Sequence, residues 1–269
     1  MAFRKRKCGK TVSPDFSGCK LHYKTGNLQG IGSRSNQEDS FTLVNALDEQ
    51  MYDKLGLMFA VCDGMGGMKD GKTASEKAIY KLREFFASMD RRGRISEQLK
   101  DAVFSASAAV EDALGGDGGS TAVVGIIFHE KLYFACVGDS YLYLYRNGSL
   151  YRLNRHHTVC NDLYMENIRS GSTETQSCRE NNEAAALSQF LGMPGLSDVD
   201  AAVRPLNLRK EDVLLACSDG VGGVLDDSDI IEALAWSDPQ DNCRRLEEHI
   251  IERAAPNQDN YTALIVRCK

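Results

Sequence analysis

The strongest constraint on the fold of this chain is an apolar run that ends in an acidic residue and a group of glycines. Six apolar residues at positions 57–62 precede Asp63, and glycines follow at positions 64, 66 and 67. The run is typical of a buried strand, and glycine permits backbone angles that other residues avoid in a tight turn. An ionised carboxylate at the end of a buried strand needs a partner or a metal ion. Asp63 is therefore expected either to cap the next helix or to bind a cation.

The length and composition favour one large domain. A chain of 269 residues with 42% apolar residues can bury a sizeable core, and no shift in composition indicates a linker. No apolar run reaches the roughly 18 residues needed to cross a bilayer. The basic N-terminus lacks the apolar segment of a secretory signal. We therefore predict a cytoplasmic protein without membrane insertion.

Charge and cysteine content argue against two classes of protein. The net charge of −6 disfavours general nucleic-acid binding. The nine cysteines contain no CxxC pair and are odd in number, which fits reduced core thiols rather than a zinc site. His156, His157 and Cys160 are an alternative metal-binding group, but no second cluster completes such a site.

Apolar periodicity predicts strands that alternate with pairs of helices. The predicted strands are residues 28–31, 41–47, 57–62, 121–128, 132–137, 141–145, 213–217 and 262–266. The predicted helices are residues 74–85, 95–113, 230–234 and 243–250. Gly115-Gly116 is expected to end the second helix, and Asn147-Gly148 is typical of a hairpin turn.

Two stretches leave alternatives open. Tyr141, Tyr143 and Tyr145 alternate along one predicted strand and form either a binding stripe or, as we favour, a face packed beneath a helix. Residues 154–182 are polar and without a clear period, which is typical of a functional or mobile segment.

Acidic residues recur at the ends of the predicted strands. Asp63 and Asp219 each precede glycine, Asp139 lies in a Gly-Asp-Ser turn, and Asp259 precedes the last strand. Each is an ordinary turn by itself. Together they predict convergence at one edge of a sheet, where Mg²⁺ or Mn²⁺ would take oxygen ligands.

A polar turn after the first predicted strand adds an arginine to this acidic set. Arg34 lies just before Glu38 and Asp39. A planar guanidinium beside carboxylates is suited to bidentate capture of a phosphate next to a metal ion.

These motifs, in this order, resemble the metal-dependent serine/threonine protein phosphatases of type 2C, also called the PPM family. The matching segments are Arg34-Ser35-Asn36-Gln37-Glu38-Asp39, Asp63-Gly64-Met65-Gly66-Gly67, Gly119-Ser120-Thr121, Gly138-Asp139-Ser140, Ser218-Asp219-Gly220 and Asp259-Asn260-Tyr261-Thr262. The resemblance implies an α+β fold, a four-layer α-β-β-α sandwich with two central antiparallel sheets and a metal centre at one end.

The resemblance also implies domain boundaries. Residues 1–26 would be a basic N-terminal extension, and residues 27–269 the catalytic domain, with a flap-like segment at about 154–190. Residues 1–20 carry a cluster of five basic residues at positions 4–10 and are expected to be a mobile arm rather than a docking patch for an acidic partner. Those residues are Arg4, Lys5, Arg6, Lys7 and Lys10.

By the same resemblance, the acidic turns receive individual roles at the metal centre. Asp63 would bridge two metal ions, and the Gly64 carbonyl would bind the second. Asp219 and Asp259 would hold the first. Asp139, together with Asp219, would bind a third, weaker ion.

The polar turn would serve the same centre. Arg34 would grip the substrate phosphate, while Glu38 and Asp39 would act through bound water. Two Mg²⁺ or Mn²⁺ ions would activate a bridging water for direct attack on phosphoserine or phosphothreonine in proteins. No covalent phosphoenzyme is required, so none of the cysteines is expected to be a nucleophile.

The chain departs from the family pattern at two positions. Met65 stands where many eukaryotic members carry a histidine proposed as a proton donor, and this change is more like bacterial members. Tyr141 stands where arginine often follows Gly-Asp-Ser. The expected partners are phosphoprotein substrates and a bacterial-type serine/threonine kinase with its targets, and the expected state is a monomer.

Two other functions compete with this interpretation. A catalytically silent phosphatase-like binding or sensor module would be expected to lack one of Asp63, Asp219 and Asp259, and all three are present. A two-metal nuclease would be expected to have a basic surface, which the net charge of −6 disfavours.

Overall fold

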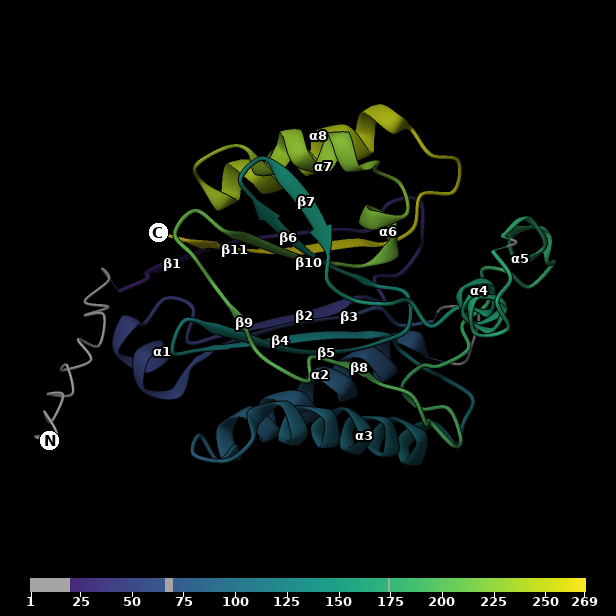
Figure 1. Cartoon of the computed structure of the whole chain (residues 1–269), viewed down its shortest axis with the longest axis horizontal. Coiled ribbons are helices and arrows are strands. Elements are labelled where there is room, and N and C mark those ends of the chain that lie inside the picture. Colours follow the sequence, from purple (N-terminus) through teal and green to yellow (C-terminus); the bar gives the residue numbers. More distant parts are fainter. Residues whose placement is uncertain (1–19, 66–69, 174) are drawn as a thin grey trace, which may run out of the picture.

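Two antiparallel sheets stack face to face in the computed structural model, which describes residues 20–65, 70–173 and 175–269 (Figure 1). The first sheet contains β1 (Tyr23–Gly30), β11 (Tyr261–Cys268), β10 (Val213–Cys217), β6 (Tyr141–Arg146) and β7 (Ser149–Arg152), in this order across the sheet. The second contains β2 (Ser40–Val44), β3 (Leu57–Cys62), β4 (Ala122–Phe128), β5 (Lys131–Val137) and β8 (Asp200–Ala201), and β9 (Leu206–Asn207) also pairs with β5.

Helices cover the outer faces of both sheets. The second sheet packs on α2 (Gly71–Ser88) and α3 (Ile95–Leu114), and the first on α7 (Asp227–Leu234) and α8 (Pro239–Arg253) (Figure 1). The remaining helices are α1 (Glu49–Leu55), α4 (Val159–Arg169), α5 (Gln176–Glu180) and α6 (Asp219–Gly222). This arrangement confirms the predicted α-β-β-α sandwich. Within the described residues, none of these helices has both the length and the apolar character that a bilayer crossing requires.

The continuous apolar runs of the central strands follow from burial on both faces. Successive side chains of a strand point to opposite faces of the sheet. In β3, Met58 and Ala60 join the core beneath α2 and α3, whereas Phe59 and Val61 join the core between the two sheets. The run that ends at Asp63 is thus anchored by two hydrophobic cores at once.

The tyrosine row belongs mainly to the third core, between the first sheet and α7 and α8. Tyr143 is buried in the same hydrophobic cluster as Ile230 and Leu246, and its ring stacks on that of Tyr141 with centroids 5.6 Å apart. The expectation of a face packed beneath helices is confirmed.

Several element boundaries differ from the sequence-based prediction. β1 begins at Tyr23 and pairs with β11 along its whole length, and β2 ends at Val44 because Asn45 adopts a left-handed backbone with φ of 61°. Helix α1 was not predicted.

Two predicted turns are confirmed. The hairpin at Asn147-Gly148 and the helix end at Gly115 both show positive φ angles. The basic residues at positions 4–10 lie outside the described residues.

A buried ion pair links the end of β6 to the loop before β10. Arg146 donates from Nε and Nη2 to the two carboxylate oxygens of Asp212, at 2.7 and 2.5 Å. Asp212 also accepts the Arg209 amide at 2.7 Å, and its side chain is 1% exposed. A pair with this geometry satisfies both charges, so removal of one partner leaves the other buried and uncompensated.

We expect Asp212→Ala to lower the free energy of unfolding by about 3 kcal/mol, because Arg146 would keep its charge without its partner. Urea denaturation followed by circular dichroism measures this change. Glu211→Ala is the matched control, since Glu211 is an exposed neighbour with looser ion pairs to Arg267 and Lys269 and should change stability by less than about 1 kcal/mol. Equal effects of the two variants would contradict the assigned role of the buried pair.

Candidate metal and phosphate site

The sheet topology brings four aspartates to one end of the sandwich. β3 and β5 both run antiparallel to β4, so their C-terminal ends lie at the same edge, where Asp63 and Asp139 follow them. β10 runs antiparallel to β11, so Asp219, which follows β10, lies near Asp259, which precedes β11. Helix α6, which starts at Asp219, lies at the end of the sandwich opposite the C-terminus (Figure 1).

Backbone pairing holds Asp63 in place beyond the end of β3. Its amide donates to Thr121 Oγ1 at 3.1 Å, and its carbonyl accepts the Thr121 amide at 2.8 Å. Gly64 continues the pairing with a bridge to Ser120. Thr121 Oγ1 also lies 2.7 Å from Ser140 Oγ, beside Asp139. The two turns that carry Asp63 and Asp139 are thus joined through Thr121.

Gly64 is required for close approach rather than for an unusual φ, which corrects the expectation from the sequence. A Cβ atom at this position would lie 2.1 Å from the Gly71 carbonyl oxygen and 2.7 Å from that of Glu38, and Gly64 is absent from the glycines with positive φ. The other glycines of the predicted turn, Gly66 and Gly67, lie outside the described residues.

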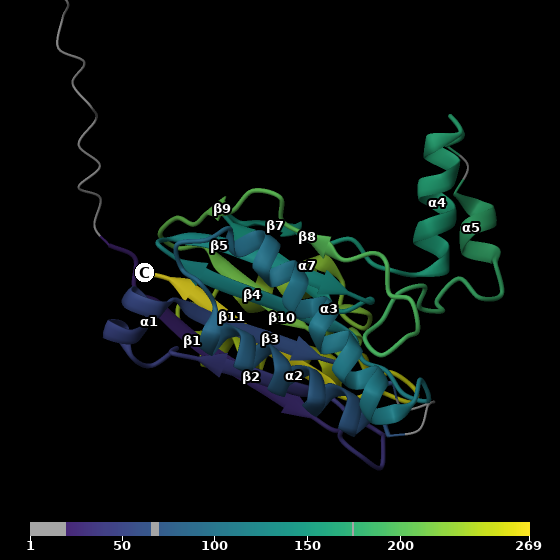
Figure 2. The same cartoon turned by 90° about the horizontal axis from the view of Figure 1, so that it is seen from below.

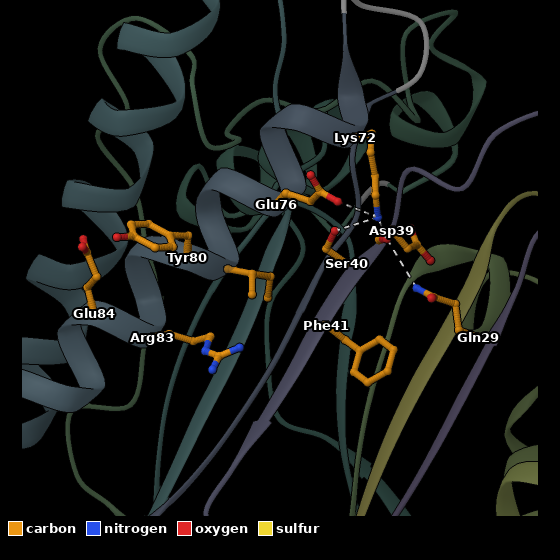
Figure 3. A pocket seen from close by; sticks show the side chains of 10 residues that line it. Gln29, Asp39, Ser40, Phe41, Lys72, Glu76, Tyr80, Arg83 and Glu84 are labelled. Carbon is orange, nitrogen blue, oxygen red and sulfur yellow. Dashed lines mark hydrogen bonds and ion pairs between the residues drawn. The ribbon is translucent and has the colours of Figure 1, made fainter.

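Asp39 is fully buried next to this end of the sandwich. Ser218 Oγ donates to Asp39 Oδ2 at 2.8 Å. The Asp39 carbonyl accepts from Lys72 Nζ at 3.0 Å and from Gln29 Nε2 at 3.4 Å (Figure 3). Its Oδ1 atom is buried without a hydrogen-bond partner, and so is Oδ1 of Asp219. Both oxygens are available to a ligand of the acidic site.

Asn260 fixes the polar turn against the last strand. Its Oδ1 accepts the Glu38 amide at 2.7 Å, and its Nδ2 donates to the carbonyls of Ile31 and Asn36 at 2.9 and 3.0 Å. These three bonds hold Arg34 and Glu38 beside Asp259. Arg34 Nη2 lies 2.6 Å from Asp259 Oδ2, and both side chains are partly exposed.

Burial and mutual repulsion raise the pKa values of the clustered carboxyl groups. For Asp63, burial is the main cause, followed by the charges of Asp39, Asp219, Asp139 and Asp259, and its pKa lies well above the usual range. Burial raises the pKa of Asp39 and of Asp139 to about 6 in each case. Burial and the charge of Asp259 raise the pKa of Asp219, although a hydrogen bond to Asp63 opposes the shift. Burial also raises the pKa of Glu38.

The donor set fits hard divalent cations. All members are carboxylates, the ligands that Mg²⁺ and Mn²⁺ prefer, and two buried carboxylate oxygens lack partners. Among the described residues, no three His, Cys, Asp or Glu side chains are arranged as a completed metal site. In this arrangement the carboxyl groups interact with one another through charge and hydrogen bonds. Arg34 forms a hydrogen bond with Asp259.

His156, His157 and Cys160 do not form the alternative metal site in the described structure. His157 is buried, and its Nδ1 accepts the Gly138 amide at 3.2 Å, so it supports the turn that holds Asp139. The His156 ring packs edge-on against Tyr141 at 4.3 Å.

The thiol of Cys62, which precedes Asp63 in the chain, is unsuited to nucleophilic attack. Burial raises the pKa of Cys62, and the charges of Asp39 and Asp63 raise it further. This environment agrees with the expectation of a core thiol.

The structure shows which residues surround Tyr141 and Met65, the two departures from the family pattern. Tyr141 lies so close to Gly222 that a Cβ there would be 2.4 Å from its ring. Met65 reaches Gly119, where a Cβ would lie 2.0 Å from its terminal methyl group. Tyr141 thus packs against the end of α6, and Met65 packs against the residue before Ser120.

Sequence reasoning did not assign roles to several residues that organise the site. The recognised motifs include Ser218, Thr121 and Asn260, but the sequence did not indicate which residues their side chains contact. Lys72 and Gln29 were missed entirely, because a lysine on a helix and a glutamine on a strand give no local signal of a contact with Asp39.

The predicted flap-like segment is partly helical. It contains α4 and α5, which project away from the sandwich near its acidic end (Figure 2). No residue of α4 is fully buried, which explains why its sequence lacks a strong apolar period. The bridge Thr158 to Leu187 closes the base of this segment, and the bridge Ser120 to Leu191 ties the end of the segment to the body.

A cavity of about 770 Å³ lies on the α2 side of Asp39 (Figure 3). Phe41, Ile79 and Arg83 line it, but Asp63, Asp219 and Asp259 do not. It is therefore adjacent to the acidic group rather than part of it.

Solved phosphatases share this sandwich. The PPM Ser-Thr phosphatase MsPP from Mycobacterium smegmatis, solved in complex with cacodylate, is 27% identical, has a TM-score of 0.70, and is matched over 91% of this chain and 97% of that chain. The catalytic domain of the serine threonine protein phosphatase PstP, in complex with two manganese ions, has the same fold at 24% identity, with a TM-score of 0.72 and coverage of 93% and 99%.

The sequence comparisons define the family. The serine/threonine phosphatase stp of Listeria monocytogenes serovar 1/2a is 30% identical over 222 residues, which cover 77% of this chain and 82% of that protein. Residues 23–187 match the family Protein phosphatase 2C. The chain belongs to the protein phosphatase 2C family.

We expect Asp139→Asn to stabilise the metal-free protein at neutral pH. The raised pKa of about 6 means that folding favours the protonated carboxyl, so its contribution to stability is complete below pH 4 and is lost as the pH rises through 6. Relative to wild type, the variant should gain about 2 kcal/mol between pH 4 and pH 7.5. Urea denaturation in the presence of a chelator measures this. Exposed Asp101→Asn is the control, and a pH-independent difference for Asp139→Asn would contradict the burial argument.

Proposed function

We propose that this protein hydrolyses phosphoserine and phosphothreonine in proteins with the help of divalent cations bound at the acidic end of the sandwich. The observation that carries the proposal is the meeting of Asp39, Asp63, Asp139 and Asp219, two of them with unpartnered buried oxygens, beside Arg34. Membership of the protein phosphatase 2C family supports the same chemistry. No observation favours a catalytically silent module.

The acidic residues would hold two Mg²⁺ or Mn²⁺ ions, and Asp139 with Asp219 would hold a third, weaker one. The two manganese ions of the PstP structure support this count. Asp63, the Gly64 carbonyl, Asp219 and Asp259 would be the direct ligands. When bound, such ions would supply the Lewis acidity that activates water and neutralises charge on the phosphoryl oxygens.

The protein's own residues would position these groups. Ser218 orients Asp39, and Glu38 and Asp39 would contribute through water. Arg34 would bind two phosphate oxygens through its guanidinium group. For this it would have to leave Asp259, which a cation would then take as a ligand. The ion pair is partly exposed, so its exchange should cost less than about 1 kcal/mol.

The substrates would be phosphoproteins, and a bacterial-type serine/threonine kinase would supply them. Support comes from the Listeria and mycobacterial relatives, which are named as serine/threonine phosphatases. Met65, which cannot donate a proton, would leave protonation of the departing serine or threonine oxygen to metal-bound water.

We expect Asp63→Asn and Asp219→Asn to reduce Mn²⁺-dependent release of phosphate from a phosphothreonine peptide by a factor on the order of 10² to 10³, with the fold retained. The reason is the loss of a negative charge that would hold the cations. Phosphate release with and without a chelator measures activity, and circular dichroism checks the fold. Asp101→Asn is the matched control. Wild-type turnover in both site variants would refute the metal assignment.

Arg34→Ala should mainly weaken substrate capture. Loss of a charge-assisted pair of hydrogen bonds should raise KM by roughly 10- to 100-fold, with a smaller fall in kcat. Steady-state kinetics on the same peptide separate the two parameters. A loss confined to kcat would contradict the assigned role of Arg34.

A further inference from the structure

An uncharged hollow of about 420 Å³ adjoins the loop that carries Arg34. Among the described residues that line it, none is charged, although charged residues make up 26% of the chain. Its apolar walls come from the loop after β1 and from the end of α8. The lining includes Ile31, Ile250, Ile251, Ala254 and Ala255.

The hollow exposes large apolar side chains to solvent. Ile251 is 66% exposed and Ile31 is 45% exposed, whereas Ile250 behind them belongs to the core. Exposed apolar surface that gathers in one concave place is typical of a binding site rather than of ordinary surface.

Hydrogen bonds hold the walls in position. The Ser33 amide donates to the Gln258 carbonyl at 2.8 Å, and Asn260 Nδ2 donates to the Ile31 carbonyl at 2.9 Å. Gly32 has a φ of 60°, and a Cβ there would lie 2.3 Å from the Asp259 carbonyl oxygen. A wall formed in advance reduces the entropy lost when a ligand binds.

On each wall of the hollow, a lining residue is the sequence neighbour of a proposed phosphate-binding or metal-binding residue. Ser33 precedes Arg34, and Gln258 precedes Asp259. Neighbouring Cα atoms are about 3.8 Å apart, and an extended peptide advances about 3.3 to 3.6 Å per residue. A peptide whose phosphate contacts Arg34 would therefore bring a residue one to three positions away to this hollow.

We propose that the hollow between Ile31 and Ile251 is a substrate subsite that accepts an apolar side chain within three positions of the phosphorylated residue. This inference rests on the proposed phosphatase function and narrows its substrate class to phosphopeptides with an apolar neighbour. Burial of such a side chain against the two isoleucines supplies affinity, and the lack of charged groups in the lining disfavours a charged neighbour.

The test compares phosphothreonine peptides that carry leucine or asparagine at each position from three before to three after the phosphorylated residue. At one position at least, leucine should raise kcat/KM of the wild-type protein about tenfold over asparagine. Ile251→Asp and Ile31→Asp should reduce this ratio to about one, whereas Ile251→Leu should keep it. Val203→Asp is the matched control, because Val203 is 91% exposed and does not line the hollow.

Hydrolysis of p-nitrophenyl phosphate, which has no flanking residues, separates the two possible failures. If this compound is hydrolysed with Mn²⁺ but leucine gives no preference at any position, or the preference survives in Ile251→Asp and Ile31→Asp, the subsite is refuted and the phosphatase function stands. If neither this compound nor any peptide is hydrolysed, the proposed function fails, and the subsite fails with it.

Discussion

The structure depends on the electrostatic cost of placing several carboxyl groups together at one partly buried end of the sandwich. Burial penalises each charge, and every neighbour of the same sign adds to the penalty. Among the described residues, Arg34 is the cation that ion-pairs with this group, and its partner is the outermost member, Asp259. The inner members, Asp39, Asp63 and Asp139, retain raised pKa values. Protons or divalent cations must therefore neutralise what the protein leaves uncompensated.

Neutral groups hold these carboxyl groups in place without cancelling their charge. Ser218 donates to Asp39, Thr121 binds the backbone of Asp63, and Asn260 binds the backbone of the polar turn. Lys72 is close, but its ammonium group contacts the Asp39 carbonyl and the Ser40 hydroxyl (Figure 3). Lysine or arginine in place of the neutral donors would stabilise the metal-free fold and weaken attraction for cations. The choice of hydroxyl and amide donors thus favours cation binding over stability.

Much of the architecture could be predicted, but for different reasons in different places. The strand runs at 57–62, 121–128 and 213–217 were recognisable because both faces of each strand are buried and the apolar pattern is unbroken. Helix α1 was missed because only Tyr52 in it is buried, and α4 was missed because none of its residues is. Periodicity reports burial, so helices without a buried face give little signal. The order of layers came from the resemblance of the motifs and not from the pattern itself.

The acidic residues were predictable as a set, whereas their supports were not. Repetition of aspartate at strand ends pointed to one edge, and the antiparallel pairing of β3, β4 and β5 places two of these ends together. Contacts such as Ser218 to Asp39 join positions 179 residues apart in the chain. No local pattern can encode a contact of that kind, since each partner is an ordinary residue in its own segment.

The glycines of the Asp-Gly turns explain why these segments can converge at all. A Cβ at Gly64 would lie 2.1 Å from the Gly71 carbonyl oxygen, and one at Gly220 would lie 2.0 Å from that of Asn260. Neither glycine has a positive φ, so close approach rather than an unusual backbone angle requires glycine here. Each marks a place where two backbones approach too closely for any side chain, one beside Asp63 and the other beside Asp219. Because the backbones pack without intervening side chains, the aspartates next to them come within range of shared cations. The aspartate and its glycine thus form one functional unit, in which the glycine provides proximity and the aspartate provides charge.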